Sequence, residues 1–233
     1  MARVSCEPAR SSGPVAFGFL AELTADEVTA LRASGRVRTY RRGAALFFEG
    51  ERSQSVAVVL RGRVKVSSLS SDGHETVLAF RGPGDLLGEL SVLDGGPRSA
   101  TVTAAEPVEA LIVIGGRFRE LLASRPRIAI VLLETLIRRL RDADRKRLEY
   151  GAFDTVGRVS RRLVELTADH GVDEATGVRI TLPLSQGELA GWTGASRESV
   201  ARALASLRRD GIISTDRRRI VVTDMDALRR TVT

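Results

Sequence analysis

Short apolar runs broken by glycine, aspartate and proline dominate the chain between Val37 and Ile114. The runs with the composition of strands are 37–40, 55–61, 63–69, 75–80, 99–104 and 108–113. Many short strands at fairly even spacing, with turn signals between them, are typical of an antiparallel barrel or sandwich. Ser71-Asp72-Gly73-His74 adds a hairpin signal within this region.

The hydrophobic period becomes helical from about Arg117. Between Arg125 and Gly151 an apolar stripe recurs every three or four positions, at Ile130, Leu133, Ile137 and Leu140. A helix of this length with so narrow a stripe favours pairing with a second helix, as in a coiled coil. Packing on the chain's own barrel is the alternative. The stripe turns polar after Leu140.

The third region mixes helical and strand patterns. Helices are predicted over 156–170, 185–193 and 196–209, and short strands over 178–183, 211–214 and 219–223. Ser185-Gln186-Gly187-Glu188 has the pattern of a capping box, and Gly194 ends the helix that it starts. Ser196 is a second N-cap directly after this turn. Two short helices joined by a tight glycine turn form a helix-turn-helix.

A helix-turn-helix places its second helix in the major groove of DNA, N-terminal residues first. Arg197, Glu198 and Arg202 lie near one face of that helix, and these residue types bond guanine and cytosine edges. The hydroxyl residues Ser185, Ser196 and Ser199 suit phosphate contacts, as does a wing carrying Arg217, Arg218 and Arg219. The alternative is an amphipathic helix pair with ordinary surface arginines.

A second constellation lies in the strand-rich region, where 84–91 is followed by 96–101. Glycine lets backbone amides approach an anion closely, and a short helix starting near Glu89 adds its N-terminal amides. Arg98 supplies a guanidinium and Ser99 a hydroxyl. A carboxylate at Glu89 suits a ribose hydroxyl better than a phosphate. A surface ion pair between Glu89 and Arg98 is the alternative interpretation.

Composition excludes several classes of protein. The 233 residues carry 36 basic and 29 acidic side chains, a net charge of +7 that permits a polyanionic partner without establishing one. A single cysteine and two histidines leave no disulfide framework, no metal cluster and no nucleophilic triad, so an enzyme is not expected. With no apolar stretch long enough for a membrane helix and no signal peptide, we expect a cytoplasmic protein.

The chain resembles the cyclic AMP receptor protein and fumarate–nitrate regulator (CRP/FNR) superfamily of bacterial transcription regulators. The matching stretches are Gly88-Glu89-Leu90-Ser91, Pro97-Arg98-Ser99-Ala100-Thr101, Arg138-Arg139-Leu140, Asp154-Thr155-Val156-Gly157-Arg158 and Gly194-Ala195-Ser196-Arg197-Glu198-Ser199-Val200. The resemblance implies an α+β fold. Its parts are a flexible N-terminus (1–17), an antiparallel, jelly-roll-like cyclic-nucleotide-binding β-roll (18–123), a dimerisation helix with hinge (124–152) and a winged helix-turn-helix (153–233).

The same resemblance implies the site residues. The cyclic nucleotide would contact Gly88, Glu89, Leu90, Ser91, Arg98, Ser99, Arg139 and Asp144. The DNA contacts would be Ser185, Ser196, Arg197, Glu198, Ser199, Arg202 and Arg218. The implied DNA is a palindromic TGTGA-N6-TCACA-like site bound by a homodimer, and RNA polymerase is a further candidate partner. No metal or resident cofactor is expected.

One pair of residues departs from the family pattern. Where cAMP-binding members present a hydroxyl or amide pair to adenine, this chain has Ala143 and Asp144. The resemblance implies cAMP as the allosteric ligand, and this departure leaves two alternatives open. One is a different nucleotide such as cGMP or cyclic di-GMP. The other is a ligand-independent regulator in which Asp144 and nearby arginines replace the ligand.

Overall fold

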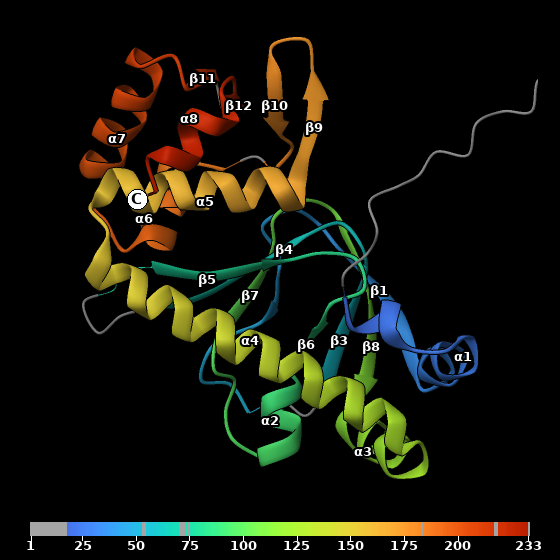
Figure 1. Cartoon of the computed structure of the whole chain (residues 1–233). Helices are drawn as coiled ribbons and strands as arrows, with labels where there is room; N and C mark the ends of the chain where they lie inside the picture. Colours follow the sequence, from blue (N-terminus) through green and yellow to red (C-terminus); the bar gives the residue numbers. More distant parts are fainter. Residues whose placement is uncertain are drawn as a thin grey trace, which may run out of the picture.

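The computed structural model describes residues 18–52, 55–69, 73, 75–182, 184–216 and 219–232. It contains a β-roll, a long helix that crosses one face of the roll, and a smaller C-terminal domain seated beside the roll (Figure 1). The predicted α+β fold class, with a β-roll, a long helix and a helix-turn-helix, is confirmed. Within the described residues, no helix is both long and apolar enough to cross a membrane.

Two four-stranded antiparallel sheets form the roll, with strand orders β1-β8-β3-β6 and β2-β7-β4-β5. The strands are β1 (Gly35–Tyr40), β2 (Ala45–Phe47), β3 (Ser55–Arg61), β4 (Val64–Leu69), β5 (Glu75–Arg81), β6 (Leu86–Leu87), β7 (Thr101–Ala104) and β8 (Val108–Ile114). Strand β3 is central to its sheet, and Val56, Ala57, Val58 and Val59 on it are fully buried. Their side chains point alternately into two core clusters.

Helices pack against the outside of the roll. They are η1 (Phe19–Glu22), α1 (Ala25–Ala33), α2 (Glu89–Asp94), α3 (Gly115–Ser124) and α4 (Pro126–Ala152). Helix α1 begins at a capping box in which Thr24 and Glu27 satisfy each other's backbone N–H groups. Helix α4 buries Ile128, Val131 and Leu132 against the roll, which anchors its first half.

The C-terminal domain combines helices with a small antiparallel sheet. Its helices are α5 (Thr155–His170), α6 (Gln186–Thr193), α7 (Arg197–Arg209) and α8 (Met225–Arg230). Its strands are β9 (Gly171–Glu174), β10 (Gly177–Ile180), β11 (Ile213–Asp216) and β12 (Arg219–Val222), in the order β11-β12-β10-β9. Helix α5 follows α4 after a break at Phe153-Asp154, where the Asp154 side chain caps α5 by accepting from the Gly157 N–H.

Some predicted elements differ from the observed ones. The strand predicted over 99–104 begins only at Thr101, because 95–100 forms the loop that carries Arg98. The short elements β2, β6, β9 and α8 had no distinct hydrophobic period and were not predicted. The hairpin signal at 71–74 lies outside the described residues apart from Gly73.

Candidate functional site

Helix α2 begins beside the loop that carries Arg98, and Gly88 is its N-cap. Gly88 has a left-handed backbone, with φ of 78°. A Cβ at this position would lie 2.4 Å from Arg98 Nη1 and 3.0 Å from the Phe47 ring. Glycine is therefore required twice, for the turn into α2 and for the close approach of the guanidinium.

Arg98 is only 4% exposed, although it comes from a loop. Its Nη1 donates to the Gly88 carbonyl at 2.8 Å and to Ser91 Oγ at 2.7 Å, and its Nη2 donates to the Ser55 carbonyl at 2.7 Å. The guanidinium also stacks on Phe47, 3.8 Å from the ring centroid. Burial lowers the pKa of Arg98, while the negative charges of Glu89 and Glu51 oppose that shift.

Glu89 is also buried, at 4% exposure, and its partner is Arg139 of the long helix. Glu89 Oε1 accepts from Arg139 Nη1 at 2.9 Å. Arg139 Nη2 donates to the Leu86 carbonyl at 2.8 Å and lies 3.6 Å from Asp85 Oδ1. The alternative of a surface ion pair between Glu89 and Arg98 is thus wrong, since both side chains are buried and Glu89 pairs with Arg139 instead. We call Gly88, Glu89, Ser91, Arg98 and Arg139 the sensing site.

Arg81, at the end of β5, belongs to the same charged neighbourhood. Burial lowers the pKa of Arg81, as does the nearby charge of Arg139, whereas Asp85, Glu89 and Asp142 raise it. Sequence reasoning missed Arg81 and Asp142 because they lie outside the matching motifs, and it gave no role to Asp85, which lies within 84–91. The signal that could have identified Arg81 is its position at the end of a predicted strand, directly before the Gly82-Pro83-Gly84 turn.

The other predicted ligand residues lie at the edge of the sensing site or apart from it. Ser99 is exposed beside Arg98, and the Leu90 side chain is exposed on the outer face of α2. Ala143 follows Arg139 by one helical turn and so lies on the face of α4 that carries Arg139. Asp144 follows Ile137 by two turns and continues the opposite, exposed stripe of α4.

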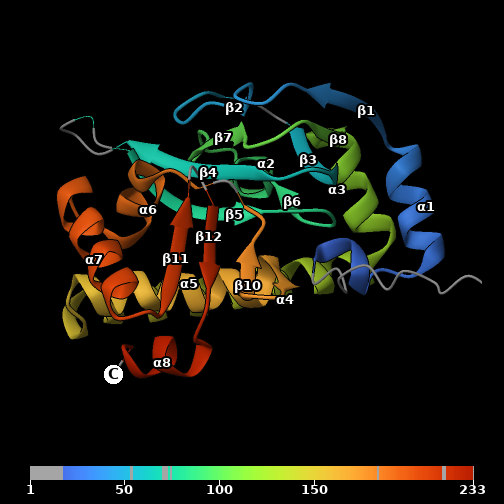
Figure 2. The ribbon, with the colours of Figure 1, turned by 90° about the horizontal axis from the view of Figure 1, so that it is seen from above.

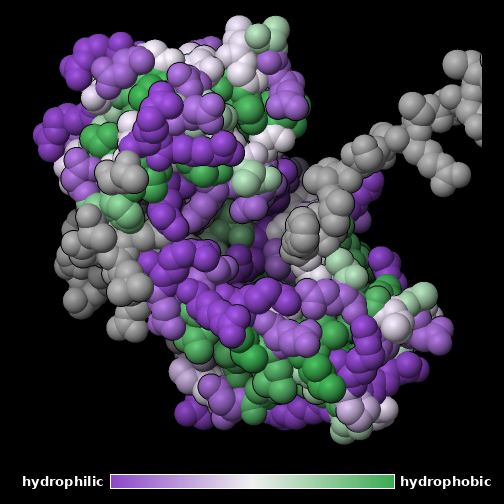
Figure 3. Space-filling model, in the orientation of Figure 1, coloured by the Kyte–Doolittle hydropathy of each residue, from purple (hydrophilic) through white to green (hydrophobic). Residues whose placement is uncertain are grey.

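That exposed stripe is apolar over most of its length. Ile130, Leu133, Ile137 and Leu140, which we call the seam stripe, are between 48% and 63% exposed. Leu90 and Leu93 of α2 add exposed apolar surface, and Figure 3 shows the apolar patch over this part of the molecule. The sequence predicted this stripe, and the described residues of the barrel leave about half of its side-chain surface exposed.

Helices α6 and α7 form the predicted helix-turn-helix. Ser185 and Glu188 make the capping box of α6, and Gly194 ends that helix with a φ of 61°. Ser196 caps α7 by accepting from the Ser199 N–H at 3.1 Å. Val200, Leu204 and Leu207 are buried on the inner face of α7.

The predicted base-reading residues lie on the outer face of α7. Arg197, Glu198 and Arg202 are exposed, and Arg202 Nη2 donates to Ser199 Oγ at 3.0 Å. Hydrogen bonds from its own backbone N–H and from Ser196 lower the pKa of Glu198, which keeps it an acceptor. Ser185 is half-buried and its Oγ lies 2.7 Å from Glu188 Oε2, so its hydroxyl is already engaged in the cap.

The predicted basic wing is only partly described. Arg219 Nη2 donates to Glu174 Oε2 at 2.6 Å, so this arginine ties β12 to the β9–β10 hairpin. Arg217 and Arg218 lie outside the described residues. The β9–β10 hairpin, which the sequence reasoning missed in part, extends the wing to four strands.

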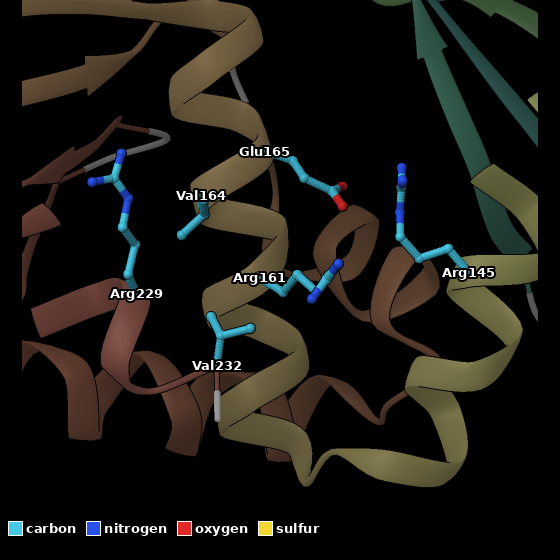
Figure 4. Close-up of a pocket in the computed structure, with 6 residues that line it drawn as sticks. All are labelled: Arg145, Arg161, Val164, Glu165, Arg229 and Val232. Atoms are coloured by element: carbon cyan, nitrogen blue, oxygen red, sulfur yellow. The ribbon is translucent and has the colours of Figure 1, made fainter. Parts of the chain in front are cut away.

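A separate cleft of about 350 Å³ lies where α4, α5 and the C-terminal segment meet. Its lining residues are Arg145, Arg161, Val164, Glu165, Arg229 and Val232 (Figure 4). Within the described residues it shares no lining residue with the sensing site.

Two family models match this chain, one over the β-roll and one over the C-terminal domain. Residues 37–125 match the cyclic nucleotide-binding domain, and residues 157–231 match the Crp-like helix-turn-helix domain. Together with the long helix between them, these domains define a DNA-binding transcription regulator with a cyclic nucleotide-binding domain.

Two relatives identify the family of regulators to which the chain belongs. The CRP-like cAMP-activated global transcriptional regulator of Mycobacterium tuberculosis is 35% identical over 189 residues, which cover 81% of this chain and 84% of that protein. The cyclic AMP receptor protein of Thermus thermophilus is 33% identical over 192 residues, covering 82% and 85%. The chain belongs to the CRP/FNR family of transcription regulators.

A solved structure shows the same fold over most of the chain. The c-di-GMP responsive global regulator CLP of Xanthomonas campestris has a TM-score of 0.77 at 25% identity, covering 85% of this chain and 99% of that one. The relatives' names thus include two different nucleotides, cAMP and cyclic di-GMP.

Proposed function

We propose that this protein is a homodimeric regulator whose binding to DNA is controlled by a cyclic nucleotide, with cAMP as the first candidate. The observation that carries the proposal is the ion pair between Glu89 and Arg139. It joins the short helix of the sensing site to the long helix that presents the seam stripe. A ligand that engages Glu89 would therefore act on an interaction of α4.

The residues of the sensing site suit a cyclic nucleotide chemically. A cyclic phosphate would take guanidinium donors from Arg98 and hydroxyl and amide donors from Ser99 and the start of α2. Arg98 donates to the Gly88, Ser91 and Ser55 oxygens, so a bound phosphate oxygen would replace one of these three residues as an acceptor of the guanidinium. Glu89 would accept a hydrogen bond from the ribose 2′-hydroxyl, in exchange with or beside Arg139.

The seam stripe supports the proposed homodimer. Four exposed apolar side chains at alternating spacings of three and four residues match one face of a two-helix coiled coil. In such a dimer Asp144, which continues the stripe, would face the partner chain. Ligand binding would then shift the population of helix-pair arrangements. Helix α7 is the recognition helix, and the two copies of it in the dimer would reach major grooves about 34 Å apart.

A different nucleotide remains the second candidate for one specific reason. Ala143 offers no side-chain hydrogen bond, and Asp144 brings a carboxylate where hydroxyl or amide side chains are expected. A purine with a different hydrogen-bonding edge, as in cGMP or cyclic di-GMP, would suit an acidic acceptor. The ligand-independent alternative predicts no nucleotide binding at all.

Isothermal titration with cAMP, cGMP and cyclic di-GMP tests the proposal. We expect binding of one of the three near one ligand per chain. Arg139→Ala should weaken DNA binding in the presence of that ligand. Its neighbour Arg138→Ala is the control, because Arg138 pairs with Glu22 away from the sensing site, at 2.7 Å. Absence of heat with all three nucleotides would overturn the ligand-controlled proposal.

A further inference from the structure

The first helix of the helix-turn-helix packs directly on the β-roll. Trp192 of α6 meets Phe80 of β5 edge-on, with ring centroids 5.2 Å apart and an interplanar angle of 61°. Both rings are less than 10% exposed. Val77 and Phe80 belong to the same apolar cluster as the core of the C-terminal domain. Figures 1 and 2 both show α6 lying against β5.

A glycine makes this approach possible. Gly191 precedes Trp192, and a Cβ on it would lie 2.6 Å from the Glu75 carbonyl oxygen and 3.3 Å from the Val77 nitrogen. Glycine destabilises a helix interior relative to alanine, so its presence in α6 calls for another reason. The close approach of the β5 backbone supplies one.

Polar side chains from both domains surround the apolar contact. Lys65 of β4 lies 2.8 Å from Glu75 and 4.0 Å from Glu188 of α6. Arg63 donates to Thr181 Oγ1 at 3.3 Å, which adds a link between the roll and the loop before α6. The contact therefore has an apolar centre with a polar edge, like a small protein interface.

Docking fixes α6 and leaves the outer face of α7 open. Helix α7 packs on α6 and α5, while Arg197, Glu198 and Arg202 stay exposed. The orientation of α7 relative to the roll is thus set where α6 meets β5. Strand β5 also carries Arg81, the residue after Phe80, into the charged neighbourhood of the sensing site.

We infer that Gly191, Trp192 and Phe80 are positioning residues: the docked contact of α6 on β5 holds the recognition helix at the orientation that a two-half-site DNA needs. This inference rests on the proposed function. In a dimer, two modules that are held at the right spacing bind a palindrome far more tightly than either module binds alone. Loss of docking would remove that gain and leave the reading of one half-site intact.

The test compares two duplexes and two glycine variants, with cAMP, cGMP or cyclic di-GMP present at saturation in every titration. Gly191→Ala adds a methyl group that α6 tolerates and the β5 backbone does not. Gly116→Ala in α3 is the control, since nothing lies within 4 Å of the added Cβ. We expect Gly191→Ala to weaken binding to a TGTGA-N6-TCACA duplex at least about tenfold, with less than about twofold loss on a duplex with one half-site scrambled.

Fluorescence supplies an independent readout, because Trp192 is the only tryptophan in the chain. Undocking should shift its emission to longer wavelength in Gly191→Ala and in a second variant, Phe80→Ala. The control Phe48→Ala removes a phenylalanine that is 54% exposed and should leave the emission unchanged.

Four outcomes would overturn the inference or its foundation. Equal loss on both duplexes would mean a damaged helix-turn-helix, and unchanged binding to both would mean that docking positions nothing. Tighter palindrome binding by Gly191→Ala would mean that docking opposes DNA binding. A wild-type chain that binds neither duplex with any of the three nucleotides at saturation would instead overturn the proposed function, and with it the role given to docking.

Discussion

At the level of single residues, Arg98 depends on Gly88 for the position of its guanidinium. The 2.4 Å separation that a Cβ would create there is a steric overlap with Arg98 itself. Arg98 is buried and donates to oxygens of Gly88, Ser91 and Ser55, which leaves it little room to move away. A change at Gly88 should therefore act on ligand binding through Arg98.

Gly88→Ala is expected to weaken cyclic nucleotide binding at least about tenfold, because the methyl group displaces Arg98. A left-handed alanine also costs about 1–2 kcal/mol of stability. Gly95→Ala is the matched control: Gly95 has a φ of 76°, but nothing lies within 4 Å of its added Cβ. Titration calorimetry on both variants separates the effects. Equal loss of affinity would show that backbone strain, rather than Arg98, decides binding.

Arg197→Ala should relax specificity at one guanine, at a cost of about 1–3 kcal/mol, because a bidentate contact to one base is lost. The measurement is competition binding with duplexes substituted at single positions. Arg208→Ala, at the other end of α7 where Arg208 donates to Thr215, should leave the base preference unchanged. A uniform loss of affinity over all sequences would make Arg197 a phosphate contact.

The sequence motifs named Gly88, Glu89 and Arg98 and the N-caps Ser185 and Ser196, since each follows from local spacing. The partner of Glu89 was beyond local reasoning, because Arg139 lies 50 residues away and is brought in by the packing of α4 on the roll. Arg81 was missed for the same reason. Long-range packing, not local pattern, decides which charges meet.

At the level of elements, α4 has two faces with different tasks. One buries Ile128, Val131 and Leu132 on the roll and carries Arg139, and the other presents the seam stripe. The period of the apolar residues predicted the helix nearly to its ends. Short strands such as β6 and β9 were not predictable, because two to four residues show no period and their pairing comes from neighbouring strands.

Ile137→Glu should convert the dimer to a monomer, because it places a charge in the centre of the seam stripe. Full burial of an exposed apolar side chain contributes about 1.5–3 kcal/mol, so each half-exposed side chain of the stripe contributes on the order of 1 kcal/mol to association. Val172→Glu is the control, since Val172 on β9 is 47% exposed, close to the 48% of Ile137. Sedimentation velocity measures the mass. A dimeric Ile137→Glu chain would place the interface elsewhere.

At the level of the whole molecule, His170 lies where the two domains meet. Its carbonyl accepts from Thr181, which in turn accepts from Arg63 of the roll. Burial lowers the pKa of His170, and the charge of Arg63 lowers it further, while Asp169 opposes both. The folded protein therefore resists protonation of this ring more than the unfolded chain does.

Stability should fall as the pH drops below about 6.5, the ordinary value for histidine, because the unfolded chain then binds a proton that the folded one refuses. Above that pH this contribution is fully present. Urea unfolding between pH 8 and 5 measures the slope, and His170→Gln should flatten it. Identical slopes for the variant and the wild type would show that other groups set the pH dependence.

The most direct test of ligand control is the affinity for a TGTGA-N6-TCACA duplex, measured by fluorescence anisotropy with and without saturating cAMP. If a ligand at Glu89 acts through Arg139 on α4, cAMP should tighten DNA binding at least about tenfold, within the usual range of allosteric coupling. Arg139→Ala should lose that response. The same affinity with and without cAMP, cGMP and cyclic di-GMP would contradict a ligand-controlled regulator.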